Sequence, residues 1–326
     1  MSEPVLSVRD LAVTIGRRAV VDGVGFDIAA GETMALVGES GCGKSLTALA
    51  LLRLLPGAAK LTGGAVAFEG ADLTQVDEPE MRRIRGNRAS IIFQDPLSSL
   101  DPLMTVGDQL VEGIRAHRAT GRGEARGQAL AMLKAVGISE PERRLAQYPF
   151  ELSGGMCQRI MIAIALAARP AVLIADEPTT ALDVTIQAQI LDLMKGLLRE
   201  FGTSILLITH DMGVVAEMAD RLAVMYAGRI VEHGPTDAIF ARPRHPYTAL
   251  LLKSVPRLDD APKSEMAVIE GSVPAHDEWP PGCRFAERCP LAEPRCRAEQ
   301  PPDQAVAGGR GVACWRHDDV AAGRLP

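Results

Sequence analysis

The stretch of this chain that most clearly could do chemistry is a glycine-rich loop that ends in a lysine and a serine. An apolar run, Met34 to Val37, precedes it, and a segment rich in helix formers follows it. Glycines let several backbone N–H groups point at phosphate oxygens, and the helix start adds the positive end of its dipole. The lysine is expected to reach the β- and γ-phosphates of a nucleotide, and the serine to bind Mg²⁺. The pattern G-x-x-x-x-G-K-S is formed by Gly38, Glu39, Ser40, Gly41, Cys42, Gly43, Lys44 and Ser45.

Two adjacent carboxylates form a second candidate group. Asp176 and Glu177 directly follow an apolar run that starts at Leu173. In a protein with a phosphate loop, an acid at the end of a buried strand is where Mg²⁺ is held. We therefore expect Asp176 to bind the metal, directly or through water, and Glu177 to polarise the water that attacks the γ-phosphate. The alternative is a carboxylate pair that only caps a helix.

Gln94 and His210 are weaker candidates when each is considered alone. Gln94 ends the apolar run that starts at Ser90, and His210 ends the run that starts at Ser204. In an open α/β sheet, ligands gather at the carboxyl ends of the strands. Both side chains are therefore expected to lie near the phosphate loop.

Short apolar strands that alternate with helical segments indicate an α/β domain with a mostly parallel sheet. Residues 5–32 alternate like an antiparallel β region, and residues 96–158 have helical spacing. We expect one domain over residues 1–255, with a helical subdomain inserted at about 96–158. Prolines and cysteines become frequent after about residue 255, so residues 256–326 are expected to form a small, loop-rich extension.

Composition and charge restrict the possible partners. A net charge of −6 argues against nucleic acid as the main partner, and aromatic residues make up only 4%, too few for extensive base stacking. The first ten residues have no apolar segment of the kind found in signal peptides. No apolar run approaches the roughly 20 residues that span a bilayer. We therefore expect a soluble or peripheral protein.

Taken together, these residues resemble the ATP-binding cassette (ABC) transporter ATPases. The decisive segment is Leu152 to Gln158, which reads L-S-G-G-M-C-Q, and the resemblance covers about residues 5–255. It implies a RecA-like P-loop NTPase core with an N-terminal antiparallel β region and a helical signature subdomain, followed by a small Cys/Pro-rich C-terminal extension. In one departure from the family pattern, Ile15 stands where an aromatic residue often stacks on adenine.

The resemblance also implies that two such domains work as a head-to-tail pair. ATP and Mg²⁺ would lie between the phosphate loop of one domain and Ser153, Gly154 and Gly155 of the other, where a helix start forms a second anion site. Gln94 would sense Mg²⁺ or water and relay the change to a membrane subunit through the helical region. His210 would contact the γ-phosphate and support Glu177. Asp183 would cross the interface between the two domains.

A finer resemblance is to the ATPase subunits of dipeptide/oligopeptide importers and nickel importers. It is carried by Phe93–Pro102, Asp176–Thr185, His245–Thr248 and Gly282–Phe285. It implies an ATP-hydrolysing subunit that powers import of di- or oligopeptides across the cytoplasmic membrane, with nickel as the alternative cargo. The implied partners are a second ABC ATPase subunit, identical or related, two membrane permease subunits and an extracytoplasmic solute-binding protein. The expected location is the cytoplasmic face of the inner membrane.

Four cysteines in the extension could hold a metal. Their spacing is C-x5-C-x6-C-x17-C, and four thiolates can bind a zinc ion or an iron–sulfur cluster. The tight C-x2–4-C pair of most zinc sites is missing. In the peptide-importer subfamily, the tail that this extension resembles carries a [4Fe-4S] cluster. The cluster, zinc and no metal therefore remain as three alternatives for Cys283, Cys289, Cys296 and Cys314.

Three other classes share some of these motifs. DNA-maintenance ATPases place long coiled coils between the two motifs, whereas here only about 110 residues separate Lys44 from Ser153, without sustained heptads. Ribosome-associated cassette proteins generally carry two cassettes. A non-catalytic cassette would be expected to lack Glu177 or His210, and both are present.

Overall fold

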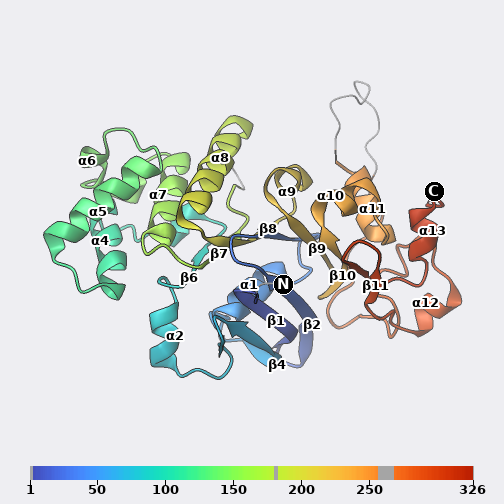
Figure 1. Cartoon of the computed structure of the whole chain (residues 1–326). Helices are drawn as coiled ribbons and strands as arrows, with labels where there is room; N and C mark the ends of the chain where they lie inside the picture. Colours follow the sequence, from blue (N-terminus) through green and yellow to red (C-terminus); the bar gives the residue numbers. More distant parts are fainter. Residues whose placement is uncertain (1–2, 180–182, 256–267, 326) are drawn as a thin grey trace. The chain divides into compact units, whose positions relative to one another are not determined.

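The computed structural model describes residues 3–179, 183–255 and 268–325. Two compact units form from separate stretches of the chain (Figure 1). The first unit comprises Met1–Leu6, Asp27–Glu32 and Ala67–Ile208, and the second comprises Ser7–Phe26, Thr33–Val66 and Thr209–Pro326.

A parallel sheet forms the centre of the first unit. β7 has β6 on one side and β8 on the other, both in parallel register. All five residues of β7 are buried, as expected for a strand of a parallel sheet that is covered on both faces. The predicted parallel strands are therefore confirmed. Their bounds are β6 (Ala89–Ile92), β7 (Val172–Asp176) and β8 (Ser204–Thr209).

Helices make up most of the rest of the first unit. The apolar residues that predicted helices, such as Leu110, Ile114 and Leu133, are buried. No helix among the described residues is long and apolar enough to cross a membrane. The elements are β5 (Ala71–Asp72), α2 (Glu78–Ile84), α3 (Pro96–Ser99), α4 (Val106–His117), α5 (Arg122–Ala135), α6 (Pro141–Arg144), the 3₁₀ helix η1 (Pro149–Glu151), α7 (Gly154–Leu166) and α8 (Val184–Phe201).

The second unit contains the strand that leads into the phosphate loop. This strand, β3, pairs in parallel with β9, and β9 pairs antiparallel with β10. Strands β2, β1 and β4 are neighbours, in that order, in another sheet. The bounds are β1 (Leu6–Ile15), β2 (Arg18–Ile28), β3 (Thr33–Val37), α1 (Lys44–Leu51), β4 (Ala59–Phe68), α9 (Met212–Met218), β9 (Arg221–Tyr226), β10 (Arg229–Pro235), α10 (Thr236–Ala241) and α11 (Pro246–Lys253).

The extension adds two short strands to the second unit, beyond the loops that its composition predicts. β12 pairs antiparallel with β10, and β11 pairs antiparallel with β12. Arg310 of β12 forms a buried ion pair with Glu232 of β10, with 2.6 Å between nitrogen and oxygen. The elements of the extension are α12 (Pro294–Ala298), β11 (Gln304–Val306), β12 (Arg310–Val312) and α13 (His317–Ala321).

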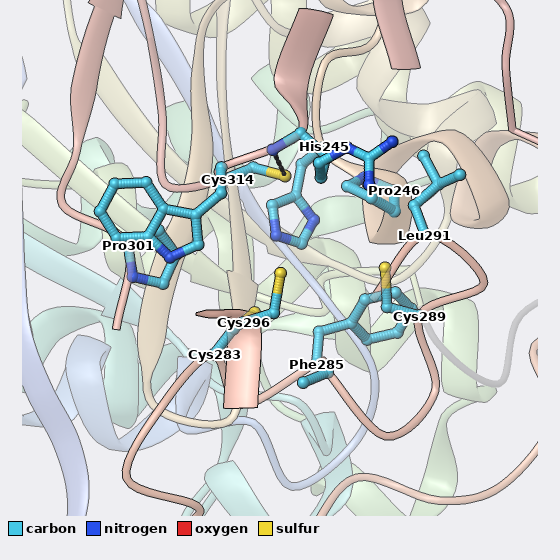
Figure 2. A pocket seen from close by; sticks show the side chains of 12 residues that line it. His245, Pro246, Cys283, Phe285, Cys289, Leu291, Cys296, Pro301 and Cys314 are labelled. Carbon is cyan, nitrogen blue, oxygen red and sulfur yellow. Dashed lines mark hydrogen bonds between the residues drawn. The ribbon is translucent and has the colours of Figure 1, made fainter. Parts of the chain in front are cut away.

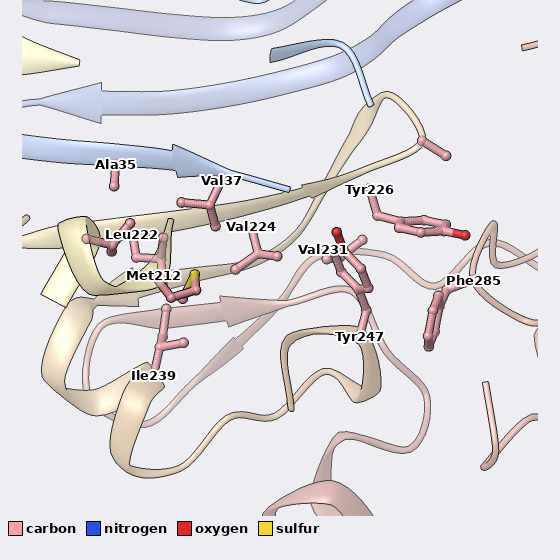
Figure 3. Packing of buried hydrophobic residues seen from close by; sticks show 12 residues of the cluster. Ala35, Val37, Met212, Leu222, Val224, Tyr226, Val231, Ile239, Tyr247 and Phe285 are labelled. Atoms are coloured by element: carbon pink, nitrogen blue, oxygen red, sulfur yellow. The ribbon is translucent and has the colours of Figure 1, made fainter. Parts of the chain in front are cut away.

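Three aromatic rings join the extension to the core of the second unit (Figure 3). The ring centroid of Tyr226, at the end of β9, lies 4.7 Å from that of Tyr247 on α11 and 5.2 Å from that of Phe285 in the extension. All three side chains are almost completely buried. Such ring pairs contribute roughly 0.5–1.5 kcal/mol each beyond the area that they bury. Phe285 therefore makes the extension part of this core.

Candidate functional site

The phosphate loop lies in the second unit, between the end of β3 at Val37 and the start of α1 at Lys44. Two of its glycines are required by close backbone contacts. A Cβ on Gly38 would lie 2.1 Å from the carbonyl oxygen of Met225, and one on Gly43 would lie 2.9 Å from that of Val20. Gly43 also has a φ of 106°, in a region that favours glycine. These contacts explain why this loop needs glycine at both positions.

Lys44 is buried, and its ammonium group lies against the loop. Its Nζ donates to the carbonyl oxygens of Gly38 at 2.7 Å and Glu39 at 3.0 Å. Next to it, Ser45 is exposed, whereas Cys42 is fully buried. Burial raises the pKa of the Cys42 thiol in spite of the nearby Lys44. Cys42 is therefore a neutral packing residue, and the roles of Lys44 toward phosphate and of Ser45 toward Mg²⁺ remain predictions.

Glu39 is anchored by two residues that sequence reasoning did not assign to the site. Its backbone N–H donates to the hydroxyl oxygen of Tyr247 at 2.9 Å. Its carboxylate accepts two hydrogen bonds from the guanidinium group of Arg288, at 2.7 and 3.0 Å. Tyr247 was within a segment that carried the finer resemblance, but nothing in that pattern pointed to the loop. No local signal could identify Arg288, which is 249 positions away in the sequence.

In the first unit, the structure brings Gln94 and Glu177 together. Their strands, β6 and β7, are adjacent and parallel, with Ile92 opposite Ala175. Nε2 of Gln94 donates to Oε2 of Glu177 at 2.9 Å. Asp176, the last residue of β7, is buried. The carboxyl ends of these two strands therefore hold an amide and two carboxylates, which are oxygen ligands of the type that bind Mg²⁺.

Glu177 also has an unusual backbone conformation. Its φ is 49°, which is uncommon for a residue other than glycine, and its N–H donates to the carbonyl oxygen of Ile208 at 2.8 Å. Such conformations cost about 1–3 kcal/mol and occur preferentially at functional sites. This strain sets Glu177 apart from an ordinary helix-capping carboxylate.

The predicted signature turn forms the exposed start of α7. Ser153 and Gly154 are exposed, and the Ser153 hydroxyl accepts from the Met156 N–H at 3.4 Å. Farther along the helix, Gln158 is buried and donates to the carbonyl oxygen of Pro178, next to Glu177. A thirteen-residue helix that starts at the surface offers free N–H groups to an anion that comes from outside the unit.

Asp183 and His210 are both exposed. Asp183 caps α8, because its carboxylate accepts from the Ile186 N–H at 3.0 Å. His210 directly follows β8 and falls in the second unit. The predicted interface role of Asp183 and γ-phosphate role of His210 remain predictions. The neighbouring motif residues 180–182 lie outside the described residues.

The four cysteines of the extension line one cavity in the second unit, together with His245, Phe285 and Arg316 (Figure 2). All four are free thiols. Burial, and to a smaller extent the neighbouring thiols, raise the pKa of Cys289 to about 11 and that of Cys314 to about 12. Cys289 and Cys314 are therefore protonated at neutral pH, and a metal would have to displace these protons.

His245 leaves one polar atom of this cavity without a partner. The ring is fully buried, and burial lowers its pKa to about 3, so it is neutral. Nδ1 accepts from the Tyr247 N–H at 3.1 Å, which places the ring proton on Nε2. Within the described part of the chain, Nε2 has no hydrogen-bond partner. No group of three or more His, Cys, Asp or Glu side chains among the described residues converges on a site for a single metal ion. The predicted zinc site and [4Fe-4S] cluster therefore lack support.

A groove of about 770 Å³ lies beside α4 in the first unit. Leu103, at its edge, is 84% exposed, and nearby Phe150 is 71% exposed. Tyr148, which lines the groove, stacks on Phe150 with ring centroids 5.5 Å apart. Exposed apolar side chains gathered beside a groove are typical of a surface that another protein covers.

Two known protein families match successive parts of the chain. The family described as "ABC transporter" matches residues 21–180. The family described as "Oligopeptide/dipeptide transporter, C-terminal region" matches residues 231–296.

Several curated proteins are similar over almost their whole length. The chain is 52% identical over 320 residues to a "Probable peptide ABC transporter ATP-binding protein" of Sinorhizobium fredii, covering 97% of this chain and 96% of the relative. It is 50% identical to the "Dipeptide transport ATP-binding protein DppD" of Bacillus subtilis, covering 98% and 96%. It is also 50% identical to the "Oligopeptide transport ATP-binding protein AppD" of the same organism, covering 93% and 92%.

Solved structures share the fold. The ATP-binding cassette MJ0796, in a dimeric post-hydrolysis state bound to ADP and Pi, is 29% identical with a TM-score of 0.63, covering 71% of this chain and 98% of that chain. The protein cbiO1 of Clostridium perfringens, part of the transporter complex cbiONQ, is 28% identical with a TM-score of 0.64, covering 74% and 92%. The expected P-loop NTPase fold is therefore confirmed.

Proposed function

The chain belongs to the family of ABC transporter ATP-binding proteins, and from this premise we propose that it hydrolyses ATP to power an importer of dipeptides or oligopeptides. The observation that carries the cargo class is near full-length identity of about 50% to peptide transport subunits, including the extension. These relatives favour peptides over nickel as the cargo. We keep the division into an ATPase domain, residues 1–255, and an extension, residues 256–326, as part of the proposal.

For the hydrolysis step, we assign a role to each polar group. The phosphate loop and Lys44 bind the triphosphate of ATP, and Ser45, Asp176 and Gln94 bind Mg²⁺ directly or through water. Glu177 polarises the attacking water, and its hydrogen bond from Gln94 holds the carboxylate in position. His210 is assigned to the γ-phosphate.

The second half of the site comes from another ABC ATPase subunit. The exposed start of α7, at Ser153 and Gly154, supports this assignment, because its N–H groups are accessible to a nucleotide held by a partner. A related cassette of 29% identity forms a dimer.

Mixing a Lys44→Ala chain with a Ser153→Phe chain tests this head-to-tail arrangement if the chain pairs with itself. A mixed dimer then has one intact site and one doubly altered site. The mixture should recover part of the ATPase activity that each variant alone has lost. No recovery in confirmed mixed dimers would contradict the head-to-tail arrangement.

ABC ATPases of peptide importers pair with membrane permeases, and we propose the groove beside α4 as the docking surface. The exposed Leu103, which lines the groove, and the exposed Phe150, which stacks on the lining residue Tyr148, support this choice. The chain would then lie at the cytoplasmic face of the inner membrane. Leu103→Asp should abolish coupling of ATP hydrolysis to transport while ATP binding stays intact. Normal coupling in that variant would show that the permease docks on another surface of the chain.

The proposed function is tested by reconstitution with its two permease subunits and solute-binding protein in vesicles. ATP-dependent uptake of labelled di- and pentapeptides, without uptake of nickel, is the expected result. Uptake of nickel without uptake of peptides would show that nickel is the cargo. Absence of ATP hydrolysis by the complex would overturn the assignment of the chain as the ATPase of an importer.

For the cysteine cavity, we propose a [4Fe-4S] cluster with a structural or regulatory role. What motivates the proposal is that four thiols share one cavity, in which the Nε2–H of His245 lacks an acceptor. A cluster distributes its four thiolates over four irons, whereas a single ion requires all of them to converge on one atom. Anaerobic purification followed by iron, sulfide and zinc assays tests the proposal. A folded protein without iron would refute it.

A further inference from the structure

In the described part of the extension, the guanidinium group of Arg288 contacts the phosphate loop. Arg288 has five N–H donors, and each of them meets an acceptor. Nη1 donates to Glu39 at 2.7 Å and to the Tyr226 hydroxyl at 3.3 Å. Nη2 donates to Glu39 at 3.0 Å and to the carbonyl oxygen of Ile269 at 3.1 Å. Nε donates to the carbonyl oxygen of Glu270 at 2.8 Å. The guanidinium group is therefore fixed in one orientation.

Burial strengthens this contact. The Arg288 side chain is 7% exposed and that of Glu39 is 30% exposed. The guanidinium carbon lies 5.7 Å from the ring centroid of Tyr226 and 5.9 Å from that of Phe285. A two-pronged, partly desolvated pair of this kind is stronger and better defined than an ion pair at the surface.

The backbone of residue 39 is held from the same side. Its N–H donates to Tyr247, whose ring packs against Phe285 with centroids 5.4 Å apart. The loop is therefore fixed through both the amide and the carboxylate of Glu39, by residues from the C-terminal part of the chain.

The charge of Glu39 explains why this contact matters to a nucleotide. A carboxylate within a loop that binds a triphosphate repels that ligand unless a nearby cation neutralises it. Arg288 supplies this cation. All its donors are already occupied by protein acceptors, so it acts on the nucleotide through Glu39 rather than as a phosphate ligand itself.

We propose that Arg288 is a positioning residue of the nucleotide site, which acts by neutralising the charge of Glu39, so that ATP affinity depends on the C-terminal extension. This inference rests on the proposed function, since it requires ATP at Gly38–Ser45.

The experiment measures the Kd for ATP in EDTA, which prevents hydrolysis, on the purified full-length chain. The variants are Arg288→Gln, Glu39→Gln and the two combined. Arg295→Gln is the control, because Arg295 is an exposed arginine of the same extension, paired with Glu299.

Arg288→Gln should raise the Kd about ten-fold, which corresponds to roughly 1.4 kcal/mol. The double variant should return to within about three-fold of wild type, because the uncompensated carboxylate is gone. The control should not change the Kd.

The double variant separates charge compensation from a purely structural role. If it binds ATP as weakly as Arg288→Gln, or if Arg288→Gln binds like wild type, the proposal is overturned. If Arg288→Gln does not fold, the Kd of Glu39→Gln tests the proposal by itself. Glu39→Gln leaves the positive charge of Arg288 uncompensated beside the phosphates, so it should tighten ATP binding about three-fold. Unchanged or weaker binding in that variant overturns the proposal. Failure of the wild-type chain to bind ATP would instead refute the proposed function.

Discussion

Replacing Glu177 by glutamine should abolish ATP hydrolysis while ATP binding is preserved. Glutamine has the shape of glutamate, and its amide oxygen can still accept the hydrogen bond that Gln94 donates at 2.9 Å. The contact between the two strand ends therefore survives, and only the carboxylate base is lost. With hydrolysis blocked, ATP should accumulate in a stable dimer.

The expected magnitude follows from the role of the carboxylate. Loss of a general base typically lowers kcat by about 10²–10⁴, which corresponds to roughly 2.7–5.4 kcal/mol. The hydrogen bond from Gln94 to a charged acceptor is worth about 1.5–3 kcal/mol. Gln94→Ala should therefore lower kcat by about ten- to a hundred-fold. The part of the Gln94 effect that passes through Glu177 is absent in Glu177→Gln, so the two losses should be less than additive in the double variant.

Phosphate release at saturating Mg²⁺-ATP measures kcat, and light scattering measures the dimer. Glu142→Gln, a change of an exposed carboxylate on α6, is the matched control and should hydrolyse ATP normally. Hydrolysis by Glu177→Gln at the wild-type rate would refute the assignment of Glu177. Fully additive losses in the double variant would refute the idea that Gln94 acts through Glu177.

Three further predictions concern the second unit. Glu232→Gln should lower the free energy of unfolding by about 3–5 kcal/mol in chemical denaturation, because it leaves Arg310 buried without its countercharge; a loss below about 1 kcal/mol would contradict this. Gly38→Ala should abolish folding or ATP binding. Gly41 has open space around it but a φ of 81°, so Gly41→Ala should lower the free energy of unfolding by only about 1–2 kcal/mol, as measured by thermal melts. The raised pKa of Cys42 keeps its thiol protonated at pH 8, so iodoacetamide should label it slowly in the folded chain and rapidly in denaturant, as measured by peptide mass spectrometry. Rapid labelling of the folded chain would contradict the burial.

The parts of the fold that the sequence predicts depend on local patterns. β7 is an unbroken apolar run that ends in an acid, and this pattern identifies both the strand and the position of Asp176. Ser153 lies just before a helix start, so its capping hydrogen bond to Met156 follows from its position in the sequence. In both cases the residues that decide the structure are close neighbours in the chain.

The remaining features depend on contacts between distant residues. β11 and β12 have only three residues each and no clear alternation, and β12 is stabilised by pairing with β10. The link between Arg288 and Glu39 joins residues 249 positions apart, and each alone looks like an ordinary charged residue. The positive φ of Glu177 depends on its hydrogen bond to Ile208, which no local pattern predicts.

The 249 positions between Glu39 and Arg288 matter during synthesis of the chain. A ribosome that adds about 5–20 residues per second reaches Arg288 roughly 12–50 s after Glu39. During that interval the phosphate loop has been synthesised, but its countercharge and the ring of Phe285 have not. The second unit can therefore complete its core only near the end of translation. An unfinished chain would bind ATP poorly, which would keep incomplete copies from competing with finished subunits for nucleotide.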